Sequence, residues 1–404
     1  MRSPIYVATL AATLLSVPTA ATPVEDTYKT RYSQWMASSI MSRGQGIMTG
    51  QGGSSEALQA GFVQKALTAL SAHYPSSAST YKDYIRKSAL STTHFLSNAT
   101  YDALSYPMDR LSNGNALLEL SSAKGASSSL RATADALRES IDLNRRNSEG
   151  GLWYFVYPYW SYLDGMFSLG PFYTLYSLTA SSNSKATAAA LKDMLFQFDI
   201  LWDRTRHAST GLLTHGYDFT RKAVWADPKT GASPYVWGRS LGWYTMALLD
   251  TLEILEREKA DKKFKAPLLK KFQTLVPGVM EAVDPKTGGW WQVVDQPGRK
   301  GNYIESSGTA MFSYALLKGA RLGYLPKDLV PKATKMATRA QRYLTDTFVV
   351  EEYDGTLGYN GTVAVCSLNS TATYEYYVGQ PILYDSVLGS AAYLLASLEV
   401  ERLK

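Results

Sequence analysis

Residues 209–253 have the sequence STGLLTHGYDFTRKAVWADPKTGASPYVWGRSLGWYTMALLDTLE. A glycine turn opens this stretch, an irregular loop rich in polar and aromatic residues follows, and a long apolar run closes it. The apolar run after Gly238 predicts a buried helix. Scaffolds commonly carry functional side chains on loops of this kind at a helix end. The alternative interpretation is an aromatic corner that is packed for stability alone.

The N-terminus has the pattern of a secretory signal peptide. Arg2 supplies a positive charge, residues 5–15 are mainly apolar, and small residues follow Pro18. The apolar run is too short to span a membrane, so we expect cleavage near Ala20 or Ala21 and a secreted, extracellular protein. Residues 1–21 are therefore assigned to the signal peptide and residues 22–404 to the folded domain.

Three sequons support a secretory route, since Asn98, Asn360 and Asn369 each begin an N-x-S/T acceptor pattern for N-glycosylation.

Cys366 is the single cysteine, so a large apolar core has to replace internal disulfides, and 45% hydrophobic residues in 404 can supply it. The net charge of +6 permits an anionic substrate but is too weak to indicate nucleic-acid binding. No later segment is long and apolar enough for a membrane span, and we expect a monomer.

Apolar residues recur at three- and four-residue steps in almost every long segment, and no alternating pattern predicts a sheet. The residues Leu191, Leu195, Phe198 and Trp202 show the helical spacing clearly. The periodicity predicts twelve helices, near 27–43, 55–73, 78–96, 110–123, 128–146, 160–181, 185–203, 236–257, 264–281, 305–323, 327–348 and 381–402.

Glycine-hydrophobic turns recur along the chain, beginning at Gly151, Gly211, Gly288 and Gly355. Their spacing suits a helical hairpin with a long loop, and DPKTG occurs twice, at 227–231 and 284–288. Helices rich in small and apolar residues alternate with charged ones, which indicates an inner and an outer ring. The sequence therefore predicts an all-α protein, an (α/α)6 barrel of six hairpins in one domain, with its site at the end where the long loops gather.

Aromatic residues concentrate in those loops. Seven of the nine tryptophans lie in or beside them: Trp153, Trp160, Trp225, Trp237, Trp243, Trp290 and Trp291. Flat aromatic faces are suited to stacking on sugar rings, so the crowding favours a carbohydrate-binding cleft. The alternative is that the rings only plug the mouth of the barrel.

Two acidic residues stand where predicted inner helices begin. Asp164 lies in WSYLDGMF, and if that segment is helical it shares a face with Trp160 and Phe167. An aspartate held against such rings loses its water, which favours the protonated form that acid–base chemistry requires. Asp109 precedes another inner helix. The alternatives are a solvent-facing carboxylate for Asp164 and a plain helix cap for Asp109.

Two other possible sites, a serine-esterase nucleophile and a metal site, are not supported by the sequence. GRSLG, residues 238–242, matches the G-x-S-x-G pattern of serine esterases. That mechanism needs a histidine after the serine, yet all four histidines precede Ser240. The histidines have no cysteine or carboxylate at ligand spacing, so we expect no metal and no other cofactor.

The segments HGYD (215–218), WADPKTGASPYVWGRSLGW (225–243) and YIESSGTAMFSYALLKGARLGYL (303–325) resemble signatures of glycoside hydrolase family 105. Members of this family are unsaturated rhamnogalacturonyl hydrolases, and the resemblance runs from about Trp35 to the C-terminus. Family 88, the unsaturated glucuronyl hydrolases, is similar more weakly.

The resemblance implies hydrolysis of an oligosaccharide, made by a polysaccharide lyase, whose terminal galacturonic acid carries a C4=C5 double bond. By motif, Asp164 matches the catalytic aspartate, which protonates C4 and activates the water that adds at C5. Asp109 matches the second acid, which binds substrate and helps to keep Asp164 protonated. The other positions that the resemblance implies in substrate binding are Tyr162, His215, Trp237, Arg239 and Trp243. Arg239 is expected to pair with the uronate carboxylate.

The sequence departs from the family pattern at two positions. Tyr162 stands where many relatives have tryptophan, and Ser168 stands where some have methionine. These departures bear on the identity of the sugar next to the unsaturated residue, rather than on the reaction. Three other functions stay open. The first is the same reaction on unsaturated glucuronyl substrates. The second is a polysaccharide lyase that uses Tyr217, His215 and Arg239, and the third is a sugar-binding protein without catalysis.

Overall fold

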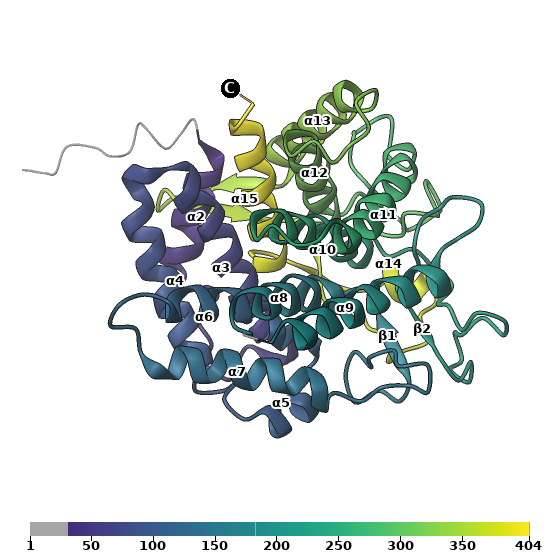
Figure 1. The fold of residues 1–404 in the computed structure, drawn as a ribbon. Coiled ribbons are helices and arrows are strands. Elements are labelled where there is room, and N and C mark those ends of the chain that lie inside the picture. Colours follow the sequence, from purple (N-terminus) through teal and green to yellow (C-terminus); the bar gives the residue numbers. More distant parts are fainter. Residues whose placement is uncertain (1–30, 182, 404) are drawn as a thin grey trace, which may run out of the picture.

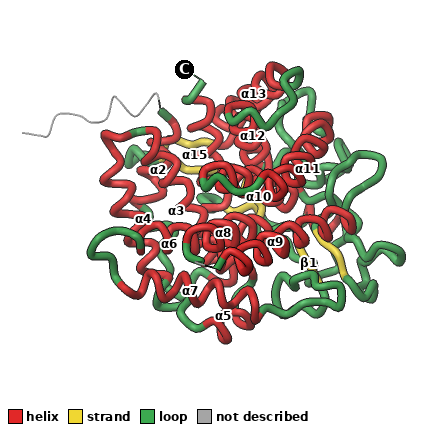
Figure 2. The backbone as a smooth tube through the Cα atoms, in the orientation of Figure 1, coloured by secondary structure: helices red, strands yellow, loops and turns green. Residues whose placement is uncertain are grey.

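The computed structural model describes residues 31–181 and 183–403. The predicted signal peptide, residues 1–21, lies outside the described residues. Figure 1 shows the helices arranged as two concentric layers, with long loops gathered on one side. The tube in Figure 2 shows the long loops of that side in green.

Six helices form the inner ring. Each contacts the next, α6 together with the preceding 3₁₀ helix η3 (Met108–Asn113), and α15 packs on α3, so the ring closes. Most residues of the inner helices are buried on all sides, which explains their small and apolar composition. These helices are α3 (Glu56–His73), α6 (Gly114–Ser121), α8 (Gly165–Thr179), α10 (Gly238–Arg257), α12 (Ser306–Arg321) and α15 (Val387–Glu401).

Six outer helices each cover one inner helix, and α2 covers α15. They are amphipathic: α13 buries Ala333, Ala337, Ala340 and Leu344 at helical spacing and exposes its charged residues. The outer helices are α2 (Tyr32–Ser42), α4 (Ala78–Thr92), α7 (Ser128–Leu143), α9 (Ser184–Thr205), α11 (Lys262–Glu281) and α13 (Val330–Phe348). The predicted (α/α)6 barrel is confirmed, and each of the twelve predicted helices has its counterpart among the described residues.

Short elements complete the loops. Two of them are the helices α5 (Ala99–Ser105) and α14 (Tyr374–Val378), and η1 (Gly53–Ser55) and η2 (Pro75–Ser77) are 3₁₀ turns. Three antiparallel pairs form, β1 (Trp160–Tyr162) with β2 (Gly216–Asp218), β3 (Val349–Glu351) with β4 (Leu357–Tyr359), and β5 (Thr362–Val363) with β6 (Ile382–Leu383). None of the helices in the described part is long and apolar enough to cross a membrane.

Two predicted helix starts are wrong, and both corrections concern the loop end of the barrel. Residues 160–162 form strand β1, and α8 begins only at Gly165, because this segment pairs with β2 instead of continuing the helix. Trp160 consequently packs on Trp225 and does not share a helical face with Asp164. Similarly, residues 382–383 pair with β5, and α15 begins at Val387.

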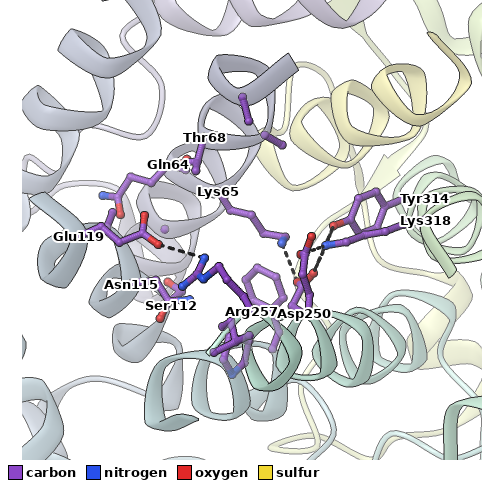
Figure 3. A pocket seen from close by; sticks show the side chains of 18 of the residues that line it. Gln64, Lys65, Thr68, Ser112, Asn115, Glu119, Asp250, Arg257, Tyr314 and Lys318 are labelled. Atoms are coloured by element: carbon purple, nitrogen blue, oxygen red, sulfur yellow. Dashed lines mark hydrogen bonds and ion pairs between the residues drawn. The ribbon is translucent and has the colours of Figure 1, made fainter. Parts of the chain in front are cut away.

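The far end of the barrel holds a cavity of about 320 Å³ that contains a buried charge network (Figure 3). Asp250 of α10 lies 2.8 Å from Nζ of Lys318 and 2.7 Å from Nζ of Lys65, and Lys318 is also 2.6 Å from Glu253. Burial alone would raise the pKa of Asp250, but the two lysine charges hold it below its usual value. The network joins α3, α10 and α12 opposite the loop end.

Replacing Lys318 by methionine should destabilise the protein by about 3 kcal/mol, because it leaves Asp250 and Glu253 with one cation fewer in a buried setting. Urea unfolding followed by circular dichroism measures this change. Lys263→Met is the control, since Lys263 forms an exposed, solvent-screened pair with Asp261 whose loss should leave the unfolding midpoint nearly unchanged. Equal midpoints for the two variants would contradict the expectation.

Candidate active site

A cavity of about 80 Å³ lies at the loop end, between the N-terminal ends of the inner helices. Six of the seven residues that the sequence predicted for the site line this cavity. His215 is fully buried behind it. The lining comprises Asp109, Asp164, Arg239, Tyr154, Phe155, Tyr157, Tyr162, Trp237 and Trp243, with Ser54, Ser55, Leu58, Pro107, Val365, Cys366, Ser367 and Leu388.

Asp164 is positioned by the β1–β2 pair. It follows β1 and directly precedes α8, and Tyr162 of β1 is paired with Gly216 of β2. The Leu163 amide also donates to the His215 carbonyl at 3.0 Å. A side chain at Gly216 would approach the Ser161 carbonyl to 2.4 Å, so the close pairing requires glycine here. The two strands thereby bring His215 beside Asp164.

The Asp164 carboxylate has two polar neighbours on a single oxygen. The Ser240 hydroxyl, in the first turn of α10, donates to Oδ2, and Nε2 of His215 lies 3.3 Å from the same oxygen. The side chain is only slightly exposed, and this exposure is to the cavity. An acid held in this way at a cavity wall can exchange a proton with a bound molecule.

Asp109 is the second buried acid of the cavity. Its Oδ2 accepts a hydrogen bond of 2.7 Å from the Tyr154 hydroxyl, and Oδ1 is buried without a hydrogen-bond partner among the described residues. Burial raises the pKa of Asp109 from 3.8 to about 7, opposed by the Tyr154 hydrogen bond and increased by the nearby charge of Asp164. Asp109 caps no helix, so the plain-cap alternative does not hold.

Arg239 holds a segment of the C-terminal region in place. Nη1 donates to the Val363 carbonyl and Nη2 to the Ala364 carbonyl, each at 2.7 Å. Glu305 lies 3.7 Å from Nη1 and accepts a hydrogen bond from the Val363 amide. Both terminal nitrogens of Arg239 are therefore already engaged by the protein, whereas the sequence predicted that they pair with the uronate carboxylate of the substrate. Only Nε and one hydrogen of Nη2 are left for a ligand.

Half of the six aromatic residues in the cavity wall are tyrosines. Tyr162 is stacked on Tyr154, with ring centroids 4.4 Å apart and 10° between the planes, and Tyr157 lies on the stack at 6.2 Å. Of the seven loop tryptophans, only Trp237 and Trp243 line the cavity. Trp225 and Trp290 instead donate to the carbonyls of Leu368 and Val279 and pack the loops and core. For most of the tryptophans the plugging alternative holds.

Two further sequence-based interpretations change with the structure. The Ser168 side chain lines the cavity at the opposite end, so its departure from the family pattern does not touch the sugar site. Tyr217 is fully buried and its hydroxyl accepts from Asn147 at 3.1 Å, so it does not join His215 and Arg239 at the cavity. The particular set of Tyr217, His215 and Arg239 is therefore not assembled at this cavity.

Several site residues were missed by sequence reasoning. Ser240 was considered only as an esterase nucleophile, and Tyr154 was not singled out. Ser240 stands three residues after Trp237 and three before Trp243. This helical spacing could have indicated that Ser240 faces the same way as Trp243. Tyr377 contacts His215 from 162 residues away and left no local signal.

The Asp109→Asn variant should lose a pH dependence of stability. Because folding raises the pKa of Asp109 from 3.8 to about 7, the folded state binds more protons across this window, and wild-type stability falls as the pH rises through it. Asparagine cannot ionise, so the melting temperature of the variant should decline less between about pH 5 and pH 8. Thermal unfolding across this range measures the difference, and parallel curves would contradict it.

Comparison with known proteins agrees with this geometry. Residues 59–404 match the family model described as Glycosyl Hydrolase Family 88. A glycoside hydrolase from family 105 of C. acetobutylicum ATCC 824 is 31% identical, with a TM-score of 0.78, and the match covers 92% of this chain and 99% of that one.

Two other proteins are similar. The 24.9 kDa protein in the picA locus of Rhizobium radiobacter is 35% identical over 215 residues, which are 52% of this chain and 90% of that protein. The unsaturated glucuronyl hydrolase from Bacillus sp. GL1 shares the fold at 13% identity, with a TM-score of 0.62 and coverage of 93% and 96%. The chain therefore belongs to the glycoside hydrolases of families 88 and 105.

Proposed function

We propose that this glycoside hydrolase releases the terminal 4,5-unsaturated galacturonic acid from rhamnogalacturonan oligosaccharides that a lyase has produced. One observation carries the proposal: Asp164 faces a cavity with aromatic walls, held by Ser240 and His215, with the protonatable Asp109 beside it. A single positioned acid suffices because the double bond, rather than the leaving oxygen, takes the proton.

In the first step the carboxylic acid of Asp164 gives its proton to C4 of the substrate. The electrons of the C4=C5 bond form the new C–H bond, and positive charge develops at C5 and the ring oxygen. Asp109 is close enough for its charge to act on Asp164, and near neutral pH about half of it is protonated. It limits the negative charge near Asp164 and supplies a hydrogen bond to the sugar.

In the second step the Asp164 carboxylate takes a proton from water, and the oxygen of this water bonds to C5. The product is a hemiketal, and Asp164 is again protonated. Cleavage of the bond between C5 and the ring oxygen then gives a ketone at C5 and a hemiacetal at C1. The hemiacetal collapses to an aldehyde and releases the remaining oligosaccharide as an alcohol.

Binding of an anionic sugar has support from the site. The cavity lies at the N-terminal ends of the inner helices, where the helix dipoles favour negative charge. The free edge of Arg239, with Nε and one Nη2 hydrogen, is a candidate for the uronate carboxylate. The stacked rings of Tyr154 and Tyr162 provide a face for a sugar.

We favour rhamnogalacturonan fragments over glucuronyl substrates because the chain is more similar in sequence to a family 105 protein than to an unsaturated glucuronyl hydrolase. The family 105 protein is 31% identical to this chain, whereas the Bacillus unsaturated glucuronyl hydrolase is 13% identical. We also propose that the protein is a secreted monomer. The exposed positions of Asn98, Asn360 and Asn369 are compatible with glycosylation along that route.

Wild-type protein should abolish the ultraviolet absorbance of an unsaturated rhamnogalacturonan disaccharide, because water adds across the absorbing double bond. Asp164→Asn should reduce this rate by at least about 10²-fold, since asparagine neither donates nor accepts the proton. Asp227→Asn is the control in the long loop before α10, because Asp227 caps a surface turn, and it should leave the rate unchanged.

Parallel assays separate the alternatives. Absorbance loss only with glucuronyl disaccharides would overturn the substrate and retain the reaction. New absorbance from intact polysaccharide would instead identify a lyase. If no substrate changes although the protein is folded, the hydrolase proposal fails.

A further inference from the structure

A buried chain of polar contacts leads from the C-terminal region to Asp164. The Tyr377 hydroxyl lies 2.8 Å from Nδ1 of His215, and Nε2 of the same ring lies 3.3 Å from Oδ2 of Asp164. Tyr377 and His215 are both fully buried. The three residues come from α14, the start of β2 and the start of α8, so only the folded chain brings them together.

The hydrogen-bonding capacity of Tyr377 determines which nitrogen of His215 carries the proton. Within the described residues the Tyr377 hydroxyl has no polar partner except Nδ1 of His215. If Nδ1 carried the proton, the tyrosine hydrogen would be buried without an acceptor, which is costly. If the tyrosine donates to Nδ1, its hydrogen is satisfied and the ring proton lies on Nε2, 3.3 Å from Oδ2 of Asp164. Burial also raises the pKa of Tyr377 well above its ordinary value, so its hydroxyl remains a donor.

With this tautomer, one oxygen of Asp164 accepts a hydrogen bond and has a second N–H group 3.3 Å away, which does not meet hydrogen-bond geometry. Ser240 donates to Oδ2, and His215 approaches the same atom. No group of the described residues donates to Oδ1, although the residue lines the cavity. A proton is most stable on the carboxylate oxygen that does not already accept hydrogen bonds, because placing it on the other would bring two donors face to face.

We propose that Tyr377 is a positioning residue that fixes His215 with its proton on Nε2, so that the acidic proton of Asp164 resides on Oδ1, facing the cavity. The inference rests on the proposed role of Asp164 and goes beyond it by identifying the reacting oxygen and the residue that selects it.

Tyr377 itself is rigidly held. Its carbonyl accepts a hydrogen bond of 3.0 Å from Nε2 of Gln292, whose Oε1 accepts from Nε1 of Trp237 at 3.1 Å. The three rings pack against one another in a triangle, with the His215 centroid 4.8 Å from that of Trp237 and 5.9 Å from that of Tyr377, and the last two 6.4 Å apart. The same packing that forms one wall of the cavity therefore fixes the hydroxyl against Nδ1.

The test compares Tyr377→Phe with Tyr374→Phe. Tyr374 lies on the same short helix, and its hydroxyl donates to the carbonyls of Arg299 and Lys300, away from the cavity. Long-range ¹H–¹⁵N spectra of protein labelled at its four histidines report the protonated nitrogen of each ring, and His215→Gln identifies the His215 signals.

We expect neutral His215 with the proton on Nε2 in wild type and in Tyr374→Phe, and a shift toward the Nδ1 form in Tyr377→Phe. With the unsaturated disaccharide, Tyr377→Phe should lower kcat about tenfold, the scale of one lost hydrogen bond, and change KM by less than about twofold. Tyr374→Phe should leave both constants as in wild type.

A wild-type His215 that carries its proton on Nδ1, or that is doubly protonated, would overturn the proposal. So would a Tyr377→Phe variant whose spectrum is unchanged, or whose loss of activity lies in KM alone. The spectra do not depend on turnover, so a protein inactive on every unsaturated sugar would refute the proposed function while the His215 result still decided this inference.

Discussion

The closed ring of inner helices is the constraint on which the rest of the structure depends. Each inner helix returns through an outer one, so all six inner helices run in the same direction and their N-terminal ends meet at one end of the barrel. The long loops enter there, and the helix dipoles make that end favourable for negative charge. Asp164, Trp237 and Glu305 all immediately precede inner helices, which is why residues far apart in sequence share one cavity.

The two ends of the barrel handle buried charge in opposite ways. At the far end, Asp250 is compensated by Lys65 and Lys318, and its pKa is lowered. At the loop end, Asp109 accepts a hydrogen bond from a tyrosine hydroxyl, no cation among the described residues is bonded to it, and its pKa rises to about 7. The first arrangement favours a fixed charge and stability. The second keeps Asp109 partly protonated near pH 7, which suits acid–base chemistry.

Arg239 and Glu305 show how support and function share residues. They hold the backbone at residues 363–364, and the next three residues, Val365, Cys366 and Ser367, enter the cavity wall. Behind them, Tyr377 reaches His215 from the same C-terminal region. A segment with little regular structure thus closes the site, because Arg239 of α10, Glu305 at the start of α12 and Tyr376 of α14 satisfy its polar groups.

The sequence by itself determined the helices, their alternation in two rings and the motif that carries Asp164. These depend on local periodicity and composition, as the spacing in 185–203 and the WGRSLGW block show. Only the tertiary structure decided that residues 160–162 form a strand, that Asp109 is the acid with the raised pKa, and that Arg239 binds backbone carbonyls. Each of these depends on partners dozens to hundreds of residues away, and burial and hydrogen bonding with such partners leave no trace in the local pattern of the chain.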